Sequence, residues 1–152
     1  MDVKTDGQES NVGLVTLLMR LSKALNKRSS EEALGMRLKW YGALGYVRDH
    51  ERLSQQDLEM AMYMDANQVV LLLNELEAAQ YLVRRRDPQD RRRHIVELTA
   101  AGKRALERAD KAREGLEGEL LAALSVEERR ALRRLVDRAL ESLAQAPVEA
   151  RA

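Results

Sequence analysis

Arginines gather between positions 84 and 93, at a density that suggests recognition of a polyanion. The cluster consists of Arg84, Arg85, Arg86, Arg91, Arg92 and Arg93, with Asp87 and Asp90 between them. Exposed ion pairs contribute only about 0–1 kcal/mol each, so a domain gains little stability from so many like charges. Guanidinium groups on a projecting tip suit phosphate, and a thin hairpin can enter the DNA minor groove. A solvated charged turn without a partner is the alternative.

Residue types that carry catalysis or bind metals are sparse. The chain has no Cys and two histidines, His50 and His94, which fall in different predicted elements. This excludes thiolate chemistry and makes a transition-metal site a poor interpretation. The serines lack a Gly-x-Ser-x-Gly elbow, and no glycine-rich phosphate loop follows a strand. We therefore expect a protein that is not an enzyme, with no catalytic residues, metal or cofactor.

A β-hairpin is predicted to hold the arginines, with strands at Leu82–Arg86 and Arg93–Leu98. Asp87-Pro88 opens the loop, because proline fixes φ for a turn and aspartate can accept from the backbone downstream. We expect only two acidic residues, Asp87 and Asp90, to balance the positive charge of the arginines in this hairpin.

Two short helices are predicted before the hairpin. The first begins after Ser54, an N-cap with Asp57 at the third helical position, and ends near Met62. Asp65 caps the second, which runs to about Gln80 and has one buried stripe, formed by Val69, Leu72, Leu73 and Leu76. Helix, turn, helix and hairpin is the order of a winged helix-turn-helix.

Further helices flank this module. Leucines at 14, 17, 18, 21 and 25 form one helical stripe, and residues 34–50 read as a second helix in which Gly42 and Gly45 permit either close packing or a kink. Thr99 caps a helix from Ala100 to about Leu124, and a capping box at 125–128 opens the last one. Apolar faces at both ends of the chain predict an intertwined homodimer, with a monomeric bundle as the alternative.

Length and composition fit one folded unit. The 152 residues are 45% hydrophobic and 34% charged, and the net charge of +1 does not by itself indicate a nucleic-acid binder. With no signal-peptide pattern and no long apolar run, we expect a cytoplasmic protein that does not enter membranes. Residues 10–143 are predicted to fold as a single unit, and residues 1–9 and 144–152 to be disordered.

Three segments resemble the MarR-type winged-helix transcriptional regulators, over about Asn11 to Leu143. They are Leu53-Ser-Gln-Gln-Asp-Leu58, Leu72-Leu-Asn-Glu-Leu-Glu77 and the run from Tyr81 through Asp-Pro-x-Asp-Arg-Arg92 to Leu98-Thr-Ala-Ala-Gly102. The resemblance implies a mainly α fold, with a DNA-binding lobe at 51–99 and dimerisation helices at 10–50 and 100–143. It also implies a homodimer that binds an inverted repeat in double-stranded DNA, as a repressor that a small ligand releases.

The resemblance also implies roles for particular positions. Asp90 and Arg92 match the tip of the family's wing, where the arginine enters the minor groove and the aspartate braces the loop. Exposed positions of the recognition helix correspond to Asn67, Gln68 and Leu71. The preceding helix begins at Ser54 and Gln55, where backbone N–H groups can meet a phosphate. With the rest of the arginine cluster and the exposed helix face, the predicted DNA contacts are Ser54, Gln55, Asn67, Gln68, Leu71, Asn74, Arg84, Arg86, Asp90, Arg91 and Arg92.

The predicted recognition helix departs from the family. No Lys or Arg occurs from Leu53 through Tyr81, and Leu71 and Glu75 stand where the family commonly has basic residues. If Val69 is at the centre of the buried stripe, Asn67, Leu71, Asn74 and Ala78 lie on the opposite, exposed side. Asn67 and Gln68 could then hydrogen-bond to adenine, and Leu71 could contact a thymine methyl group. DNA binding would then depend mainly on the two wings of the dimer, with some contribution from Arg48 and Arg52. A DNA-binding-deficient protein that acts through protein contacts is the alternative.

Aromatic residues are few, and most of them lie near the second predicted helix. Such a concentration is consistent with a pocket for a small aromatic or phenolic effector, and ordinary core packing is the alternative. The residues predicted to line it are Met36, Trp40, Tyr41, His50 and Tyr63.

Overall fold

The structure, a computed structural model, describes residues 11–145. The disorder predicted for residues 1–9 and 146–152 lies outside this range, whereas residues 144 and 145, also predicted to be disordered, belong to the last helix. The elements are α1 (Leu14–Arg28), α2 (Glu31–Leu34), α3 (Leu38–Asp49), α4 (Gln55–Met62), α5 (Ala66–Ala78), β1 (Leu82–Arg86), β2 (His94–Leu98), α6 (Ala100–Leu120) and α7 (Val126–Gln145). They divide into two compact units, one ending at Leu116 and the other beginning at Glu117.

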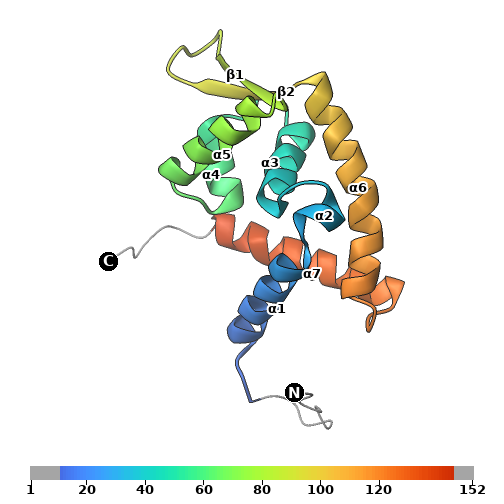
Figure 1. Cartoon of the computed structure of the whole chain (residues 1–152). Coiled ribbons are helices and arrows are strands. Elements are labelled where there is room, and N and C mark those ends of the chain that lie inside the picture. The colour runs from blue at the N-terminus through green and yellow to red at the C-terminus, as the bar shows by residue number, and fades with distance from the viewer. Residues whose placement is uncertain (1–10, 146–152) are drawn as a thin grey trace. The chain divides into compact units, whose positions relative to one another are not determined.

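The core of the first unit lies among α3, α4, α5 and the hairpin (Figure 1). The stripe predicted for α5 is confirmed, because Val69, Leu72, Leu73 and Leu76 are all buried. Leu44 of α3 and Leu58 of α4 pack in the same cluster, as does Leu106 of α6. Burying a leucine contributes about 1.5–3 kcal/mol, so this cluster fixes how α4 and α5 are presented.

The hairpin is joined to the segment before α4. β1 and β2 pair antiparallel from Leu82–Leu98 to Arg86–His94, so β2 begins one residue later than predicted. The Val96 amide donates to the Leu53 carbonyl at 2.9 Å, and Ser54 forms a bridge with Ile95. The hairpin therefore has a fixed attachment to the start of α4.

The helix predicted over residues 34–50 is wrong at its beginning. Ser30 caps the short α2, and Gly35 ends it with φ 86°, a left-handed conformation that favours glycine. The chain then starts α3 after Arg37, which is extended. α3 continues unbroken through Gly42 and Gly45, and neither glycine makes an unusually close contact.

The Leu98-Thr-x-x-Gly102 segment fastens α6 to the turn before β1. The Thr99 hydroxyl accepts from the Gly102 amide at 3.0 Å, as the predicted cap requires, and donates to the Gln80 carbonyl at 2.6 Å. The Thr99 amide donates to the Tyr81 carbonyl at 3.1 Å. A Cβ at position 102 would lie 1.9 Å from that carbonyl oxygen, so only glycine fits.

α1 and α7 each leave an apolar face exposed. α1 has no buried residue, and Leu14 and Val15 are 69% and 72% exposed. In the second unit, the predicted capping box between Ser125 and Glu128 opens α7, along which Leu135 and Leu143 are 59% and 62% exposed. α6 ends at Leu120, four residues before the predicted end near Leu124. No helix in the described part of the chain is long and apolar enough to cross a membrane.

Candidate nucleic-acid interface

The loop between β1 and β2, residues 87–93, is held at its base by Asp87. This side chain is buried, and its Oδ1 accepts from the Gln89 amide at 2.9 Å and from the Arg52 guanidinium at 2.7 Å. The Gln89 amide and the Arg52 charge hold the pKa of Asp87 below its ordinary value. The bond to Gln89 confirms the prediction that Asp87 accepts from the downstream backbone. Asp90 makes a smaller brace, by accepting from the Arg92 amide at 3.1 Å.

Three of the clustered arginines are neutralised by carboxylates. Arg84 donates to both carboxylate oxygens of Glu77 and to the Asn74 carbonyl oxygen. Arg85 pairs with Glu97 across the hairpin, and Arg93 pairs with Asp57 of α4, each at 3.1 Å.

The view that only Asp87 and Asp90 oppose the cluster is therefore wrong. Glu97 lies in the predicted second strand, so its proximity to the arginines could be inferred from the sequence. Asp57 and Glu77 lie outside the hairpin and reach the arginines only after folding. Arg84, predicted to contact DNA, is directed toward α5 in this structure, and its hydrogen bonds lower the pKa of Glu77.

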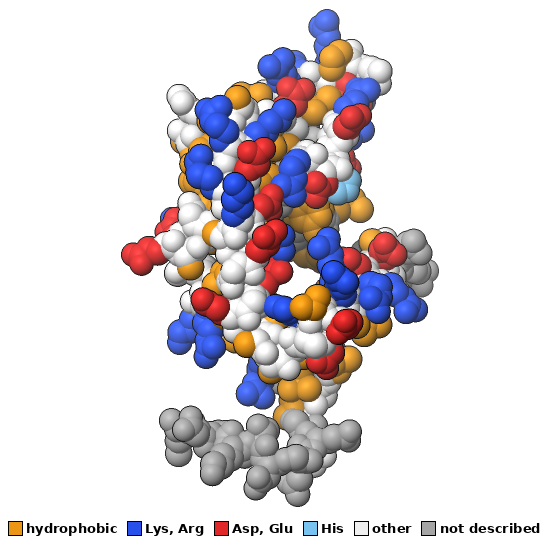
Figure 2. Space-filling view, turned by 90° about the vertical axis from the view of Figure 1, so that its right-hand side faces the viewer, with side chains coloured by type: hydrophobic (Ala, Val, Ile, Leu, Met, Phe, Trp, Pro, Cys, Tyr) orange, Lys and Arg blue, Asp and Glu red, His pale blue; other side chains and the backbone are white. Residues whose placement is uncertain are grey.

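The remaining arginines of the cluster, Arg86, Arg91 and Arg92, are exposed. None of them forms an ion pair with another described residue. Basic side chains stand at the upper end of the space-filling view, where the hairpin lies in Figure 1, whereas acidic and basic side chains mix over the face below (Figure 2). The loop thus presents guanidinium groups that are free to bind phosphate.

α5 presents a polar face beside the hairpin. Asn67, Leu71, Asn74 and Ala78 are exposed as predicted, and Leu71 is 64% exposed. Asp65 and Gln68 form a capping box, in which the Gln68 Oε1 accepts from the Asp65 amide at 3.1 Å. Because this oxygen is engaged, Gln68 does not present the free carboxamide that adenine recognition was predicted to use.

The start of α4 is also a capping box. Ser54 is 3% exposed; its hydroxyl accepts from the Asp57 amide, and its own amide donates to the Asp57 carboxylate. These bonds from Ser54, together with the Arg93 charge, lower the pKa of Asp57. Ser54 therefore positions the helix from the interior, while Gln55, the first helical residue, is partly exposed.

Comparison with known proteins agrees with the helix-turn-helix and the arginine-rich hairpin described above. Residues 34–93 match the model of the MarR family. A protein of Thauera aromatica, named as a transcriptional regulatory protein for the hcr operon, is 33% identical over 111 residues, which cover 73% of this chain and 67% of that protein. The chain belongs to the MarR family.

Solved structures confirm the winged-helix fold of this MarR-family regulator. A crystal structure of MarR superposes with a TM-score of 0.78 and 21% identity, over 91% of this chain and 95% of that one. The complex of S. aureus MepR with DNA superposes with a TM-score of 0.70 and 25% identity, over 86% and 98% of the two chains. The likeness therefore extends beyond the segment that the family model matches.

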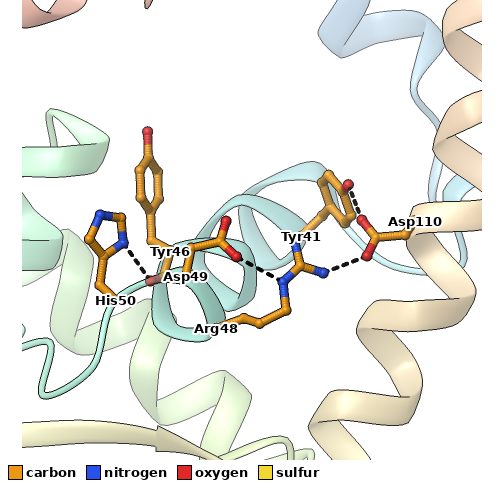
Figure 3. Close-up of polar contacts among 6 residues, drawn as sticks. All are labelled: Tyr41, Tyr46, Arg48, Asp49, His50 and Asp110. Atoms are coloured by element: carbon orange, nitrogen blue, oxygen red, sulfur yellow. Dashed lines mark hydrogen bonds and ion pairs between the residues drawn. The ribbon is translucent and has the colours of Figure 1, made fainter.

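In this MarR-family chain, the two arginines expected to add to DNA binding beside the wings form ion pairs within the protein. Arg52 binds Asp87, and Arg48 binds both Asp49, at 3.0 Å, and Asp110 of α6 (Figure 3). The Tyr41 hydroxyl donates to the same Asp110 carboxylate at 2.6 Å.

The cluster around Asp110 shifts two pKa values. Burial and the bond to Asp110 raise the pKa of Tyr41 to about 12. Burial acts to raise the pKa of Asp110, but the bonds from Tyr41 and Arg48 outweigh it, so that this pKa lies below its ordinary value. The arrangement fastens α3 to α6 within the first unit.

Three of the five residues predicted to line an effector pocket lie at the core, where Trp40 and Tyr41 pack against the cluster that includes Met36, whereas His50 and Tyr63 are exposed. The Tyr41 hydroxyl faces Asp110, and the His50 Nδ1 donates to the Tyr46 carbonyl at 3.0 Å (Figure 3). Tyr63 ends α4 in a left-handed conformation and is 64% exposed. Trp40 alone of the five lines a hollow of about 200 Å³ between α3 and α5, where its indole N–H donates to Glu75.

No group of three or more His, Asp or Glu side chains that could hold a metal occurs within residues 11–145.

Proposed function

We propose that this regulator binds an inverted repeat in double-stranded DNA as a homodimer and acts as a ligand-responsive repressor. The observation that carries the proposal is a set of three exposed arginines, Arg86 at the end of β1 and Arg91 and Arg92 in the loop. They form no ion pair with another described residue, while the other arginines of the cluster are neutralised. Free guanidinium groups on a narrow projection suit the minor groove and its phosphates. The DNA complex of S. aureus MepR supports the same use of this fold.

The fold suggests that α5 and the β1–β2 hairpin, the wing, contact different grooves of the DNA. A helix such as α5 enters a major groove, and in a dimer the two copies lie about 34–36 Å apart, one turn of the duplex. The wing then reaches the flanking minor groove. Because α5 carries no Lys or Arg, the electrostatic part of the affinity would come mainly from the two wings.

The exposed apolar faces support the homodimer. α1 exposes Leu14, Val15 and Met19, each more than half accessible, and α7 exposes Val126, Leu135 and Leu143. Exposed apolar patches of this kind commonly mark association surfaces. A second copy of the chain could cover both faces through a two-fold interface.

A ligand would release DNA only if it favoured a dimer whose α5 helices are wrongly spaced for the duplex. The hollow beside Trp40 supports such a site, because it adjoins Leu71 on α5.

Two measurements test the proposal. Sedimentation equilibrium of the full-length chain should give a dimer, and a gel shift at low salt should retard the duplex upstream of its own gene. A monomer would contradict the homodimer. A chain that retards no duplex even at low salt would contradict DNA binding and favour a protein that acts through protein contacts. For the effector, a thermal-shift screen of phenolic acids should raise the Tm, and no shift would count against the ligand response.

A further inference from the structure

The exposed face of α5 offers an unusual set of groups for reading bases. Asn67, Leu71 and Asn74 follow one another at intervals of four and three residues, so they share one side of the helix, and Gln68 adjoins them. The helix has no guanidinium or ammonium group, and Arg and Lys make the commonest specific contact with guanine. Glu75 also lies on this side, but its carboxylate already accepts from the Trp40 indole at 2.9 Å and from Arg37 at 3.5 Å. The base preference of α5 must therefore come from the amides and from Leu71.

Hydrogen bonds within the protein fix two of the three amides. The Gln68 Oε1 accepts from the Asp65 amide, and the Asn74 Oδ1 accepts from the Arg84 guanidinium, which Glu77 holds from the other side. Because the Asp65 amide and the Arg84 guanidinium are donors, the carboxamide oxygen and not the NH2 group of Gln68 and Asn74 must face them. The orientation of each carboxamide is therefore fixed. Gln68 and Asn74 therefore have only their NH2 groups left for DNA.

An NH2 group alone distinguishes bases poorly. It can donate to N7 of either purine, to O6 of guanine or to O4 of thymine. The bidentate contact with adenine needs an acceptor for the N6 amino group as well as a donor for N7. On this face only the Asn67 carboxamide keeps both, since it forms no hydrogen bond with another described residue.

Leu71 adds the second discriminating group. It is an apolar side chain, 64% exposed, one helical turn after Asn67 on an otherwise polar face. Among the groups in the major groove, the C5-methyl of thymine is the apolar one. The rise from Asn67 to Leu71 is about 6 Å, which corresponds to about two base-pair steps.

We propose that α5 selects A·T base pairs, with Leu71 in contact with a thymine methyl group and Asn67 paired with adenine. This inference rests on the proposed function. In it, Arg84 is a positioning residue that orients Asn74, and it does not contact the DNA backbone.

Replacing thymine by deoxyuridine tests the Leu71 contact directly, because it removes only the methyl group. Half-sites would first be selected from random duplexes with the full-length chain, and Kd then measured by fluorescence anisotropy at one salt concentration. The selected half-sites should contain A·T pairs. Substitution of uracil at the contacted thymine should weaken wild-type binding about fourfold, the effect expected for one buried methyl group.

The variant Leu71→Ala should bind the thymine and uracil duplexes equally. Alanine favours the helix, so the fold should survive, and circular dichroism would verify it. The matched control is Met60→Ala on α4, which removes an apolar side chain that is 72% exposed and should preserve the difference between thymine and uracil. Uracil placed outside the half-sites should have no effect.

The outcomes separate this inference from the proposed function. If the wild type binds selected duplexes but uracil is tolerated at every half-site position, or if Leu71→Ala keeps the full difference, the inference is wrong and DNA binding stands. Selection of half-sites made only of G·C pairs would also overturn it. If no duplex is bound at low salt, the proposed function and the inference fail together.

Discussion

The guanidinium of Arg52 lies 2.7 Å from the Oδ1 of Asp87 and joins the turn before α4 to the base of the wing loop. The Asp87 side chain is only 8% exposed, whereas that of Arg52 is half exposed. Arg52 adopts φ 59°, a left-handed conformation that is uncommon for a residue with a Cβ. This contact, with the pairing of Leu53 and Val96, sets the direction of the wing relative to α4 and α5.

Asp87→Asn should loosen the wing, because the neutral amide loses the ion pair with Arg52 and binds the Gln89 amide less strongly. We expect faster hydrogen exchange of residues 86–94 and weaker DNA binding, with the helices unchanged. Glu107→Gln on α6 is the control, since it removes an exposed carboxylate away from the loop. Equal exchange in Asp87→Asn and the wild type would show that Asp87 does not hold the loop.

Arg92→Ala should weaken DNA binding by about 1 kcal/mol or more and reduce the slope of log K against log salt by about 1, as expected for a lost phosphate or groove contact. Arg108→Ala on α6 removes an exposed arginine away from the loop and serves as the control. Anisotropy titrations at several salt concentrations would measure both quantities. A slope that is unchanged in Arg92→Ala would exclude this arginine from the contact with DNA.

Gly102→Ala should destabilise the fold by about 1–3 kcal/mol or more, because its Cβ would lie 1.9 Å from the Tyr81 carbonyl oxygen and force the backbone to shift. Gly115→Ala in the same helix has open space around the new methyl group and should stabilise it by about 0.5–1 kcal/mol. Urea denaturation of both variants would measure the free energy of unfolding. Equal effects would mean that α6 does not approach Tyr81 this closely.

Alkaline titration should reveal the bond between Tyr41 and Asp110. The Tyr41 pKa is raised to about 12, above the value near 10 of an unfolded tyrosine, so this phenol contributes stability that is complete below about pH 10 and is lost as pH rises toward 12. The difference in phenolate absorbance between the wild type and Tyr41→Phe should have a midpoint near pH 12. A midpoint near pH 10 would show that the phenol does not donate to Asp110 in solution.

Acid should destabilise the first unit. The pKa values of Asp57, Glu77, Asp87 and Asp110 lie below their ordinary values near 4, so their contribution is present above those values and is lost as pH falls through the lowered ones. The free energy of unfolding should change little from pH 7 to about 5 and then fall below about pH 4. Glu77→Gln should show a shallower decline, and a decline as steep as that of the wild type would show that Glu77 does not contribute to the acid sensitivity.

Local signals in the sequence were sufficient for most elements. Ser54, Asp65, Thr99 and Ser125 each cap the helix that was predicted to follow them, because an N-cap bond spans only three residues. The α5 stripe and the two strands follow from periods of 3.6 and 2.0 residues. The exception was the helix predicted from Leu34, because Gly35 adopts the left-handed conformation that a periodicity pattern does not register.

The sequence by itself thus determined the order of the elements, the arginine-rich wing and the family. Only the tertiary structure decided which charges and amides remain available to a partner. Tyr41 and Asp110 are 69 positions apart, Arg93 and Asp57 are 36 apart, and Trp40 and Glu75 are 35 apart. Such pairs depend on how helices and strands pack, and no local period encodes that packing. For the same reason only the tertiary structure showed that, of the five residues predicted to line an effector pocket, Trp40 lines the hollow between α3 and α5.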